Sequence, residues 1–332
     1  MNKNDCAIHL INPLGTLGGS ELRTLSLFGE LRDHCKVALW SIEDPHPSFV
    51  QDFPLTKIVP WKLRFPKTGT FVFVGINFEI GPWIYFTRPQ RIILVCNGQP
   101  RELFLERLER LTIKGFPKVE VVYASDELRK SFGYPGLVEP SLIDIGKFTP
   151  SETARSGATR TGFTIGRMTR DVRAKHHRAD PALYLRLVNH DCRIRIMGAT
   201  CLANALQGIE SIELLPAGVE EPHIFLRSLD CFYYRTAVWW TEPYGRVVAE
   251  AMACGLPVVC EDRGGYVELI DHGRNGFLFS TDQEAFEILL RLKEDRVLAQ
   301  SIGRAARATI EEIYSPARRA EIIKFYLRPA GR

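Results

Sequence analysis

The chain has 332 residues, of which 45% are hydrophobic and 25% are charged, and its formal net charge is +4. That length exceeds what one hydrophobic core usually supports, so we expect two domains. So small a net charge does not indicate a nucleic-acid-binding protein. No apolar stretch approaches the roughly 20 residues of a membrane-spanning helix, and no signal peptide is apparent. None of the eight cysteines forms a C-x-x-C pair, which favours free thiols in a reducing cytoplasm.

Short apolar runs that predict strands alternate with amphipathic runs that predict helices along the first 150 residues. Such alternation is typical of an α/β fold with a parallel, doubly wound sheet. The expected elements are, in order, a strand over residues 7–11, a helix over 20–31, strands over 37–41, 71–74 and 91–96, a helix over 101–114 and a strand over 119–124.

The segment 149–161 is rich in Ser, Thr, Gly and Ala, so it is the best candidate for a linker. We therefore expect one domain over residues 1–150 and another over 151–312. A second alternating series follows the linker. Its strands are expected at residues 164–166, 193–197, 211–215, 231–234 and 257–260, and its last helices at 284–293 and 295–312.

The segment 241–279 points most directly to a function. Glu242 lies in a turn that opens a helix, and Glu250 lies about two turns farther along, at about 3.6 residues per turn. Gly255 is placed to end this helix in a left-handed conformation. A helix N-terminus favours an anion, and carboxylates accept hydrogen bonds from sugar hydroxyls. The layout therefore fits a ligand with hydroxyls at both ends and phosphate between them, such as a nucleotide sugar.

The string TEPYGRVVAEAMACGLPVV resembles the E-x7-E donor-site motif of retaining glycosyltransferases with the GT-B fold, most closely glycosyltransferase family 4. Gly264, Gly265, Glu268 and Gly276 follow in the family's order. The resemblance implies a GT-B architecture, in which two Rossmann-like domains face a central cleft. It also implies that the C-terminal domain binds a nucleoside-diphosphate sugar and that the N-terminal domain binds the acceptor. A final helix over residues 313–332 would cross back to the N-terminal domain.

Two more segments resemble donor-binding segments of that family. LGTLGGSE places Gly18 and Gly19 where a strand turns into a helix, so that backbone amides can approach the donor's diphosphate. A plain glycine-rich turn is the alternative. GRMTRDVRAKHH carries Arg167 and Lys175, to which the resemblance assigns the neutralisation of the leaving diphosphate.

Lys175 stands farther along its loop than the family's lysine does, so Arg170 and Arg173 are rival candidates for its role. Adjacent His176 and His177 are poorly spaced for one metal ion. The chain also lacks an Asp-x-Asp motif, so we expect no metal and no cofactor.

Asn97 stands where many family members carry a histidine near the reacting sugar. An asparagine can form hydrogen bonds but cannot act as a base. This leaves a front-face mechanism, in which the leaving phosphate takes the acceptor's proton. A turn-capping role for Asn97 is the open alternative.

These observations predict a retaining, metal-independent glycosyltransferase that acts on a glycan or a lipid-linked acceptor in bacterial surface polysaccharide or glycoconjugate synthesis. Open alternatives are a GT-B phosphorylase or epimerase-like enzyme, or a non-catalytic homologue that binds nucleotide sugars. The expected catalytic residues are Glu242, Arg167, Lys175 and Asn97. The expected donor contacts are Gly18, Gly19, Arg167, Lys175, Leu215, Tyr244, Gly245, Arg246, Val247 and Glu250.

Two segments of the N-terminal domain, residues 61–67 and 101–118, combine basic and apolar side chains. Such surfaces often rest on anionic lipid, although ordinary solvated elements have the same composition. Peripheral contact with the inner face of the plasma membrane therefore stays open.

Overall fold

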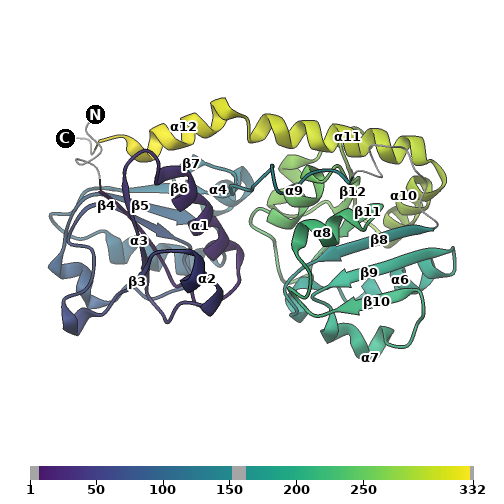
Figure 1. Cartoon of the computed structure of the whole chain (residues 1–332), viewed down its shortest axis with the longest axis horizontal. Helices are drawn as coiled ribbons and strands as arrows, with labels where there is room; N and C mark the ends of the chain where they lie inside the picture. The colour runs from purple at the N-terminus through teal and green to yellow at the C-terminus, as the bar shows by residue number, and fades with distance from the viewer. Residues whose placement is uncertain (1–6, 152–161, 330–332) are drawn as a thin grey trace. The chain divides into compact units, whose positions relative to one another are not determined.

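The computed structural model describes residues 7–151 and 162–329. The chain folds into two compact units (Figure 1). Unit 1 comprises Met1–Leu142 with Pro316–Arg332, and unit 2 comprises Ile143–Ser315. The predicted domain boundaries fall after residues 150 and 312, whereas the two units divide after residues 142 and 315. Most of the predicted linker falls outside the described residues.

Unit 1 is built on a parallel sheet of seven strands in the order β3-β2-β1-β4-β5-β6-β7. The strands are β1 (Ala7–Asn12), β2 (Lys36–Ser41), β3 (Leu55–Lys57), β4 (Thr68–Val74), β5 (Arg88–Cys96), β6 (Val119–Tyr123) and β7 (Leu137–Val138), and the helices are α1 (Gly19–Leu31), α2 (Pro47–Asp52), α3 (Arg101–Leu111), α4 (Asp126–Phe132) and α12 (Pro316–Leu327), with the short 3-10 helices η1 (Pro60–Lys62) and η2 (Pro82–Phe86).

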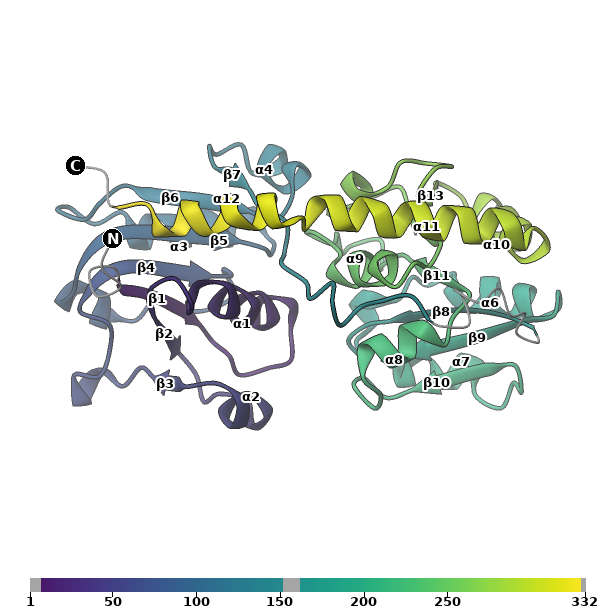
Figure 2. The same cartoon turned by 45° about the horizontal axis from the view of Figure 1, so that its top comes forward.

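The central strands of unit 1 are buried on both faces, as their continuous apolar runs predict. Phe71 and Phe73 of β4 pack in one cluster with Phe104 of α3. The last helix, α12, packs on this unit, where the backbone carbonyl of Phe325 accepts a hydrogen bond from Arg91 at 2.8 Å. Figure 2 shows α12 running beside β5 and β6.

A buried ion pair also fixes α12. Arg23 of α1 lies 3.0 Å from Glu139, which follows β7, and the Tyr326 hydroxyl donates to the same carboxylate at 3.3 Å. Because all three side chains are buried, removing one would leave an unpaired polar group in the core. The final helix is therefore part of the core of unit 1.

Unit 2 repeats the plan with a parallel sheet of six strands in the order β10-β9-β8-β11-β12-β13. Its strands are β8 (Phe163–Met168), β9 (Cys192–Met197), β10 (Ile212–Leu215), β11 (Cys231–Tyr234), β12 (Val258–Glu261) and β13 (Phe277–Phe279), and its helices are α6 (Asp180–Val188), α7 (Ala203–Leu206), α8 (Pro222–Arg227), α9 (Arg246–Ala253), α10 (Asp282–Glu294) and α11 (Arg296–Ile313), with the 3-10 helices η3 (Arg173–Lys175), η4 (Thr200–Leu202) and η5 (Gly265–Leu269).

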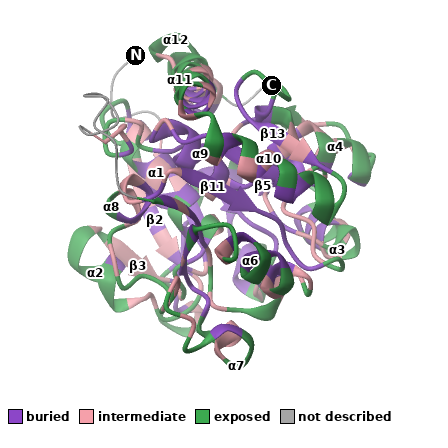
Figure 3. Cartoon of the chain, turned by 90° about the vertical axis from the view of Figure 1, so that its right-hand side faces the viewer, coloured by how far each residue is buried: buried purple, intermediate pink, exposed green. Residues whose placement is uncertain are grey.

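In unit 2 the exposure of an element depends on the layer in which it lies. Figure 3 shows β11 and α9 as buried, whereas α6 and α7 expose one side. Leu183 and Leu187 of α6 pack with Phe286 and Leu289 of α10 over one face of the sheet. Helix α9 carries only small or apolar side chains and one glutamate over residues 248–253, all buried. These arrangements confirm the predicted α/β class with two Rossmann-like sheets.

Both sheets have a point where the strand order reverses, at β1 in unit 1 and at β8 in unit 2. Ligands of open α/β sheets bind outside the carboxyl ends of the strands at such a point. Within the described residues, no helix combines the length and apolar character needed to cross a bilayer.

Candidate functional site

The carboxyl ends of β8 and β11 lie side by side in unit 2, because the two strands are parallel neighbours. The loop after β8 carries Lys175, and the loop after β11 carries Glu242. Although 67 positions separate these residues in the sequence, their side chains form an ion pair. The sheet topology therefore assembles a charged site at the reversal point of unit 2.

Glu242 is held by two donors. Besides Lys175, the hydroxyl of Tyr234 donates a hydrogen bond to the carboxylate at 2.9 Å. Burial opposes ionisation of Glu242, but the charge and hydrogen bond of Lys175, with help from Tyr234, outweigh it. The pKa of Glu242 therefore lies below its ordinary value, and the positive charge of Arg170 adds to this shift. Glu242 is thus an ionised acceptor at neutral pH.

Glu250, about two turns into α9, has different surroundings. Arg246, one turn earlier on the same helix, donates to the Glu250 carboxylate at 2.8 Å. Burial nevertheless raises the pKa of Glu250, because Arg246 offsets only part of the desolvation. The pKa of Glu242 is therefore lowered and that of Glu250 is raised, which suits the two glutamates to different parts of a ligand.

The N-terminus of α9 lies between the two glutamates in the sequence. Its N-cap, Gly245, has φ = 80° and offers no side-chain cap. A Cβ at this position would lie 2.7 Å from the Cβ of Tyr266, so both the conformation and the packing require glycine. The amides of Val248 and Ala249 donate to the Gly245 carbonyl, and the helix dipole favours an anion at this end of α9.

Arg167 does not lie at the surface of this site. Its side chain is fully buried, 4.6 Å above the ring of Tyr234. One terminal nitrogen lies 3.3 Å from Asp180, and the other donates to the backbone carbonyl of Lys175 at 2.5 Å. Contact with phosphate stays a prediction for Arg167, and its observed contacts instead fix the backbone that carries Lys175.

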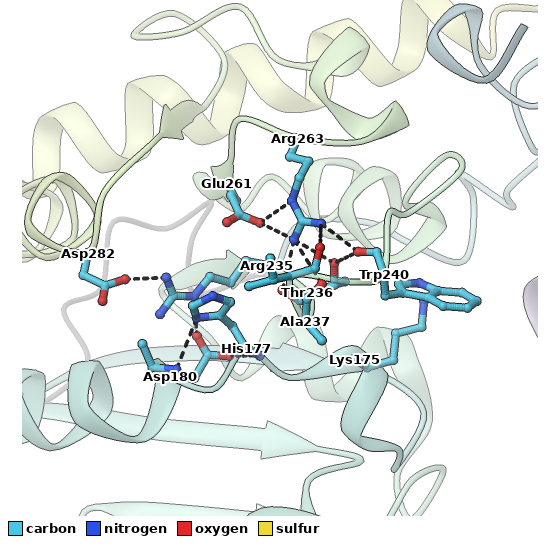
Figure 4. Close-up of polar contacts among 12 residues, drawn as sticks. Lys175, His177, Asp180, Arg235, Thr236, Ala237, Trp240, Glu261, Arg263 and Asp282 are labelled. Carbon is cyan, nitrogen blue, oxygen red and sulfur yellow. Dashed lines mark hydrogen bonds and ion pairs between the residues drawn. The ribbon is translucent and has the colours of Figure 1, made fainter. Parts of the chain in front are cut away.

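Asp180, the first residue of α6, is the centre of this buried network. Besides Arg167, its carboxylate accepts hydrogen bonds from Arg235 at 2.6 Å, from the Tyr233 hydroxyl at 3.1 Å and from the backbone amide of His177 at 3.1 Å. Figure 4 shows Arg235 reaching from β11 towards Asp180. The network therefore ties the loop after β8 to the end of β11.

Arg263 fastens the loop after β11. Its guanidinium donates to the backbone carbonyls of residues 236, 237, 238 and 240 at 3.0–3.2 Å, and to Glu261 at 2.7 Å. Figure 4 shows these bonds converging on one side chain. Next to it, Gly264 has φ = 100°, and a Cβ there would lie 3.0 Å from the carbonyl oxygen of Glu242. Arg263 and Gly264 therefore both position the loop that leads to Glu242.

The adjacent histidines do not act together. The Nε2 atom of His176 lies 2.9 Å from the backbone carbonyl of Gly198, so this nitrogen carries the proton. Burial, aided by the positive charge of Arg167, lowers the pKa of His176 to about 4. In the portion of the chain that the structure describes, no cluster of three or more His, Cys, Asp or Glu could hold a metal ion.

The other predicted donor contacts of unit 2 lie at the start of α9 and at the end of β10. Val247 lies in the first turn of α9. Tyr244 is buried, and its hydroxyl lies 2.5 Å from that of Tyr314. Leu215 ends β10, at the outer edge of the sheet. Arg173 is one of the residues that line a cavity of about 650 Å³ between the loops after β8, β9 and β11.

The predicted site residues of unit 1 lie at the carboxyl edge of its sheet. A Cβ at Gly18 would come within 2.5 Å of the Glu21 carboxylate, whereas a Cβ at Gly19 would meet nothing within 4 Å. Asn97 follows β5 and is half-buried. Their predicted roles towards a donor and an acceptor stay predictions.

Sequence reasoning missed Asp180, Arg235 and Arg263. Arg263 stands inside the segment 241–279, in the string EDRGG, but nothing in that string indicates that its partners lie in the loop 236–240. A sequence pattern can assign a role to a glycine because turns require glycine. The contacts of a long arginine side chain depend on the fold and cannot be read from the pattern.

Residues 181–309 match the sequence profile of the family described as glycosyl transferases group 1. A probable sucrose-phosphate synthase of Thermosipho melanesiensis is 46% identical over 54 residues, which cover 16% of this chain and 13% of that protein. A D-inositol 3-phosphate glycosyltransferase of an Arthrobacter strain is 27% identical over 190 residues, which cover 51% of this chain and 44% of that protein. The matched segments span less than half of these relatives' own length.

Solved structures share the fold of the whole chain. The Anabaena protein Alr3699/HepE, in complex with UDP and glucose, superposes with a TM-score of 0.77 at 16% identity, covering 97% of this chain and 99% of that one. A sucrose-phosphate synthase of Thermosynechococcus elongatus superposes with a TM-score of 0.72 at 12% identity, covering 97% and 98%. These matches confirm the expected GT-B fold.

The loop 236–240 should loosen when Arg263 is replaced. Arg263→Met removes the donor from four backbone carbonyls, and Arg263→Lys keeps the charge but lacks the five-donor fork. We expect both variants to be cleaved faster by chymotrypsin after Trp239 or Trp240, because cleavage needs local opening. Arg274→Met, which removes an exposed ion pair, is the control and should cleave like the wild type. Unchanged cleavage in Arg263→Met would show that the clamp is dispensable.

His176 should make stability depend on pH. Its pKa of about 4 in the folded state lies below the ordinary value of 6.5, so its contribution is complete above pH 6.5 and is lost as the pH falls towards 4. Between pH 7 and pH 5 we expect a loss of about 2 kcal/mol of unfolding free energy. Chemical denaturation of wild type and His176→Gln, whose amide can still donate to Gly198, measures the difference. Equal pH slopes in both proteins would contradict the assignment.

Proposed function

We propose that this chain moves a sugar from a nucleoside-diphosphate sugar to a hydroxyl of a glycan or lipid-linked acceptor, and the match of residues 181–309 to the profile of glycosyl transferases group 1 supports this. The observation that carries the proposal is the pair of differently held glutamates on either side of the α9 N-terminus, with Lys175 bound to the first. We propose further that transfer retains the anomeric configuration and takes place in the synthesis of bacterial surface polysaccharide or glycoconjugates.

In this proposal the nucleotide lies along α9. Its ribose hydroxyls donate to the carboxyl group of Glu250, and its diphosphate lies at the N-terminus of the helix, where the dipole favours an anion. UDP is the nucleotide to test first, because the Anabaena protein of the same fold was solved with UDP and with UDP-glucose. Arg246 would then keep Glu250 ionised and oriented while the ribose is bound.

The transferred sugar lies towards Glu242. Its hydroxyls donate to the ionised carboxylate, and in doing so they compete with Lys175 and Tyr234 for the same oxygen atoms. The Lys175 ammonium is then free to turn to the β-phosphate, on which negative charge grows as the glycosidic bond breaks. A preorganised cation that meets charge formed in the transition state lowers the barrier. Arg170, whose positive charge helps to lower the pKa of Glu242, would assist Lys175.

The proposed chemistry needs no side-chain base. The bond from the sugar's anomeric carbon to the β-phosphate oxygen breaks, and the acceptor hydroxyl attacks from the same face. Its proton passes to the leaving phosphate oxygen, so that the products are the glycoside and the nucleoside diphosphate. Lys175 and Arg170 take the electrostatic role that a metal ion has in other donor sites. Arg167 acts through Lys175, whose backbone carbonyl it holds.

Replacing Glu250 should weaken the binding of free nucleotide. Glu250→Gln removes a charged hydrogen-bond acceptor, which should cost roughly 1.5–3 kcal/mol and weaken UDP binding about 10- to 150-fold. Isothermal titration calorimetry with UDP measures the effect. Glu287→Gln on the exposed side of α10 is the matched control and should bind UDP normally. UDP affinity that is unchanged in Glu250→Gln would refute the nucleotide assignment.

Replacing Glu242 should spare UDP binding and impair the reaction. Contacts to parts of the sugar remote from the breaking bond serve to orient it, so their loss lowers kcat as well as raising KM. Release of UDP from UDP-glucose, with water as the acceptor, measures turnover without knowledge of the natural acceptor. We expect Glu242→Ala to lose most of this release while it binds UDP like the wild type.

Other results would contradict the role of Glu242 or favour one of the alternative functions. Wild-type turnover in Glu242→Ala would show that this residue does not hold the sugar. Turnover that needs inorganic phosphate would identify a phosphorylase, and conversion of the donor to its epimer without release of UDP would identify an epimerase-like enzyme. UDP binding without turnover of any nucleotide sugar and acceptor would indicate a non-catalytic homologue.

A further inference from the structure

We propose that one edge of the unit 1 sheet binds an anionic membrane surface. Residues 59–67 lead into β4, and residues 81–87 lead into β5. Because β4 and β5 are parallel neighbours, both segments lie at the amino-terminal edge of the sheet. The exposed side chains of this edge, here called the amino-edge patch, are Trp61, Lys62, Leu63, Arg64, Lys67, Tyr85, Phe86 and Arg88.

Buried contacts hold the two segments together. The rings of Phe65 and Trp83 are buried with their centroids 5.8 Å apart, and the Arg88 amide donates to the Lys67 carbonyl at 2.8 Å. The segments are therefore anchored as one surface. The side chains of Trp61, Tyr85 and Phe86 stay outside this core, although the core lies directly beside them.

The apolar members of the patch are unusually exposed. Trp61 is 80% exposed, Leu63 71%, Tyr85 56% and Phe86 75%. Leu63 also has φ = 52°, a left-handed conformation that a leucine rarely adopts. Large apolar side chains that gather on one surface mark a binding site rather than packing. Trp and Tyr are enriched where proteins meet the interfacial region of a bilayer.

All charged side chains of the amino-edge patch are positive. Residues 59–68 and 81–90 contain Lys62, Arg64, Lys67 and Arg88 but no Asp or Glu. Among the described residues, none of these four cations has an ion-pair partner. Lys67 lies 3.3 Å over the Phe65 ring, which holds its charge at this surface. Basic residues interleaved with exposed aromatic ones suit anionic headgroups above an apolar layer.

Charge and position both favour a lipid surface over the alternatives. A second copy of this chain would bring four like charges against four others, which opposes pairing through the patch. The patch also lies at the opposite end of β4 and β5 from the carboxyl edge, where Asn97 stands, so membrane contact leaves that edge uncovered. The proposal does not rest on transferase activity.

Sedimentation of the full chain with vesicles tests this proposal. We expect binding to vesicles of phosphatidylcholine with phosphatidylglycerol, little binding to phosphatidylcholine alone, and weaker binding as salt rises. Lys62→Glu with Arg64→Glu should weaken binding to the anionic vesicles at least about tenfold. Trp61→Ser with Phe86→Ser should weaken it comparably, because two exposed rings no longer insert.

Matched controls lie elsewhere on unit 1. Lys130→Glu reverses an exposed charge on α4 and Val50→Ser removes an exposed apolar side chain, and both should bind anionic vesicles like the wild type. Unchanged thermal unfolding and UDP affinity would show that the patch variants are folded. Failure of the wild type to bind anionic vesicles, or equal binding by the patch variants, would overturn the proposal. So would a dimer in sedimentation velocity that Trp61→Ser with Phe86→Ser abolishes.

Discussion

The buried carboxylate of Asp180 is the interaction on which the candidate site depends. It is fully buried, and it pairs with two arginines that are themselves buried, Arg167 and Arg235. A carboxylate in such a place is tolerated only when its charge and its hydrogen-bonding capacity are met. Here Tyr233 and a backbone amide complete the set. The loops after β8 and β11 are consequently tied to one carboxylate, whose charge and hydrogen-bonding capacity are met.

The functional residues are positioned through that network. Arg167 connects Asp180 to the backbone carbonyl of Lys175, and the Lys175 side chain reaches Glu242. From the other side, Arg263 holds the carbonyls of the loop that precedes Glu242. The side chains that would meet a donor are thus charged and themselves largely buried, and the residues that orient them hold the backbone of the loops that carry them. This division gives preorganised charge without a metal ion in the proposed reaction.

The sequence predicted what local patterns determine. Alternating strands and helices indicated two doubly wound sheets, and the motif placed Glu242 in a turn and Glu250 on the following helix, as α9 confirms. The contacts of Arg167 could not be predicted, because its partner Asp180 looks like an ordinary first residue of a helix until the fold buries it. The Arg263 clamp was missed for the same reason, since its partners lie on another strand's loop.

The central claim is that a nucleoside diphosphate binds at the carboxyl edge of unit 2, over the start of α9. Hydrogen–deuterium exchange of the full chain, with and without saturating UDP, tests it most directly because it locates the ligand without assuming an acceptor. The account predicts slower exchange at the amides of residues 246–249 and of the loop that carries Lys175. Saturable UDP binding with no protection in either segment would contradict it.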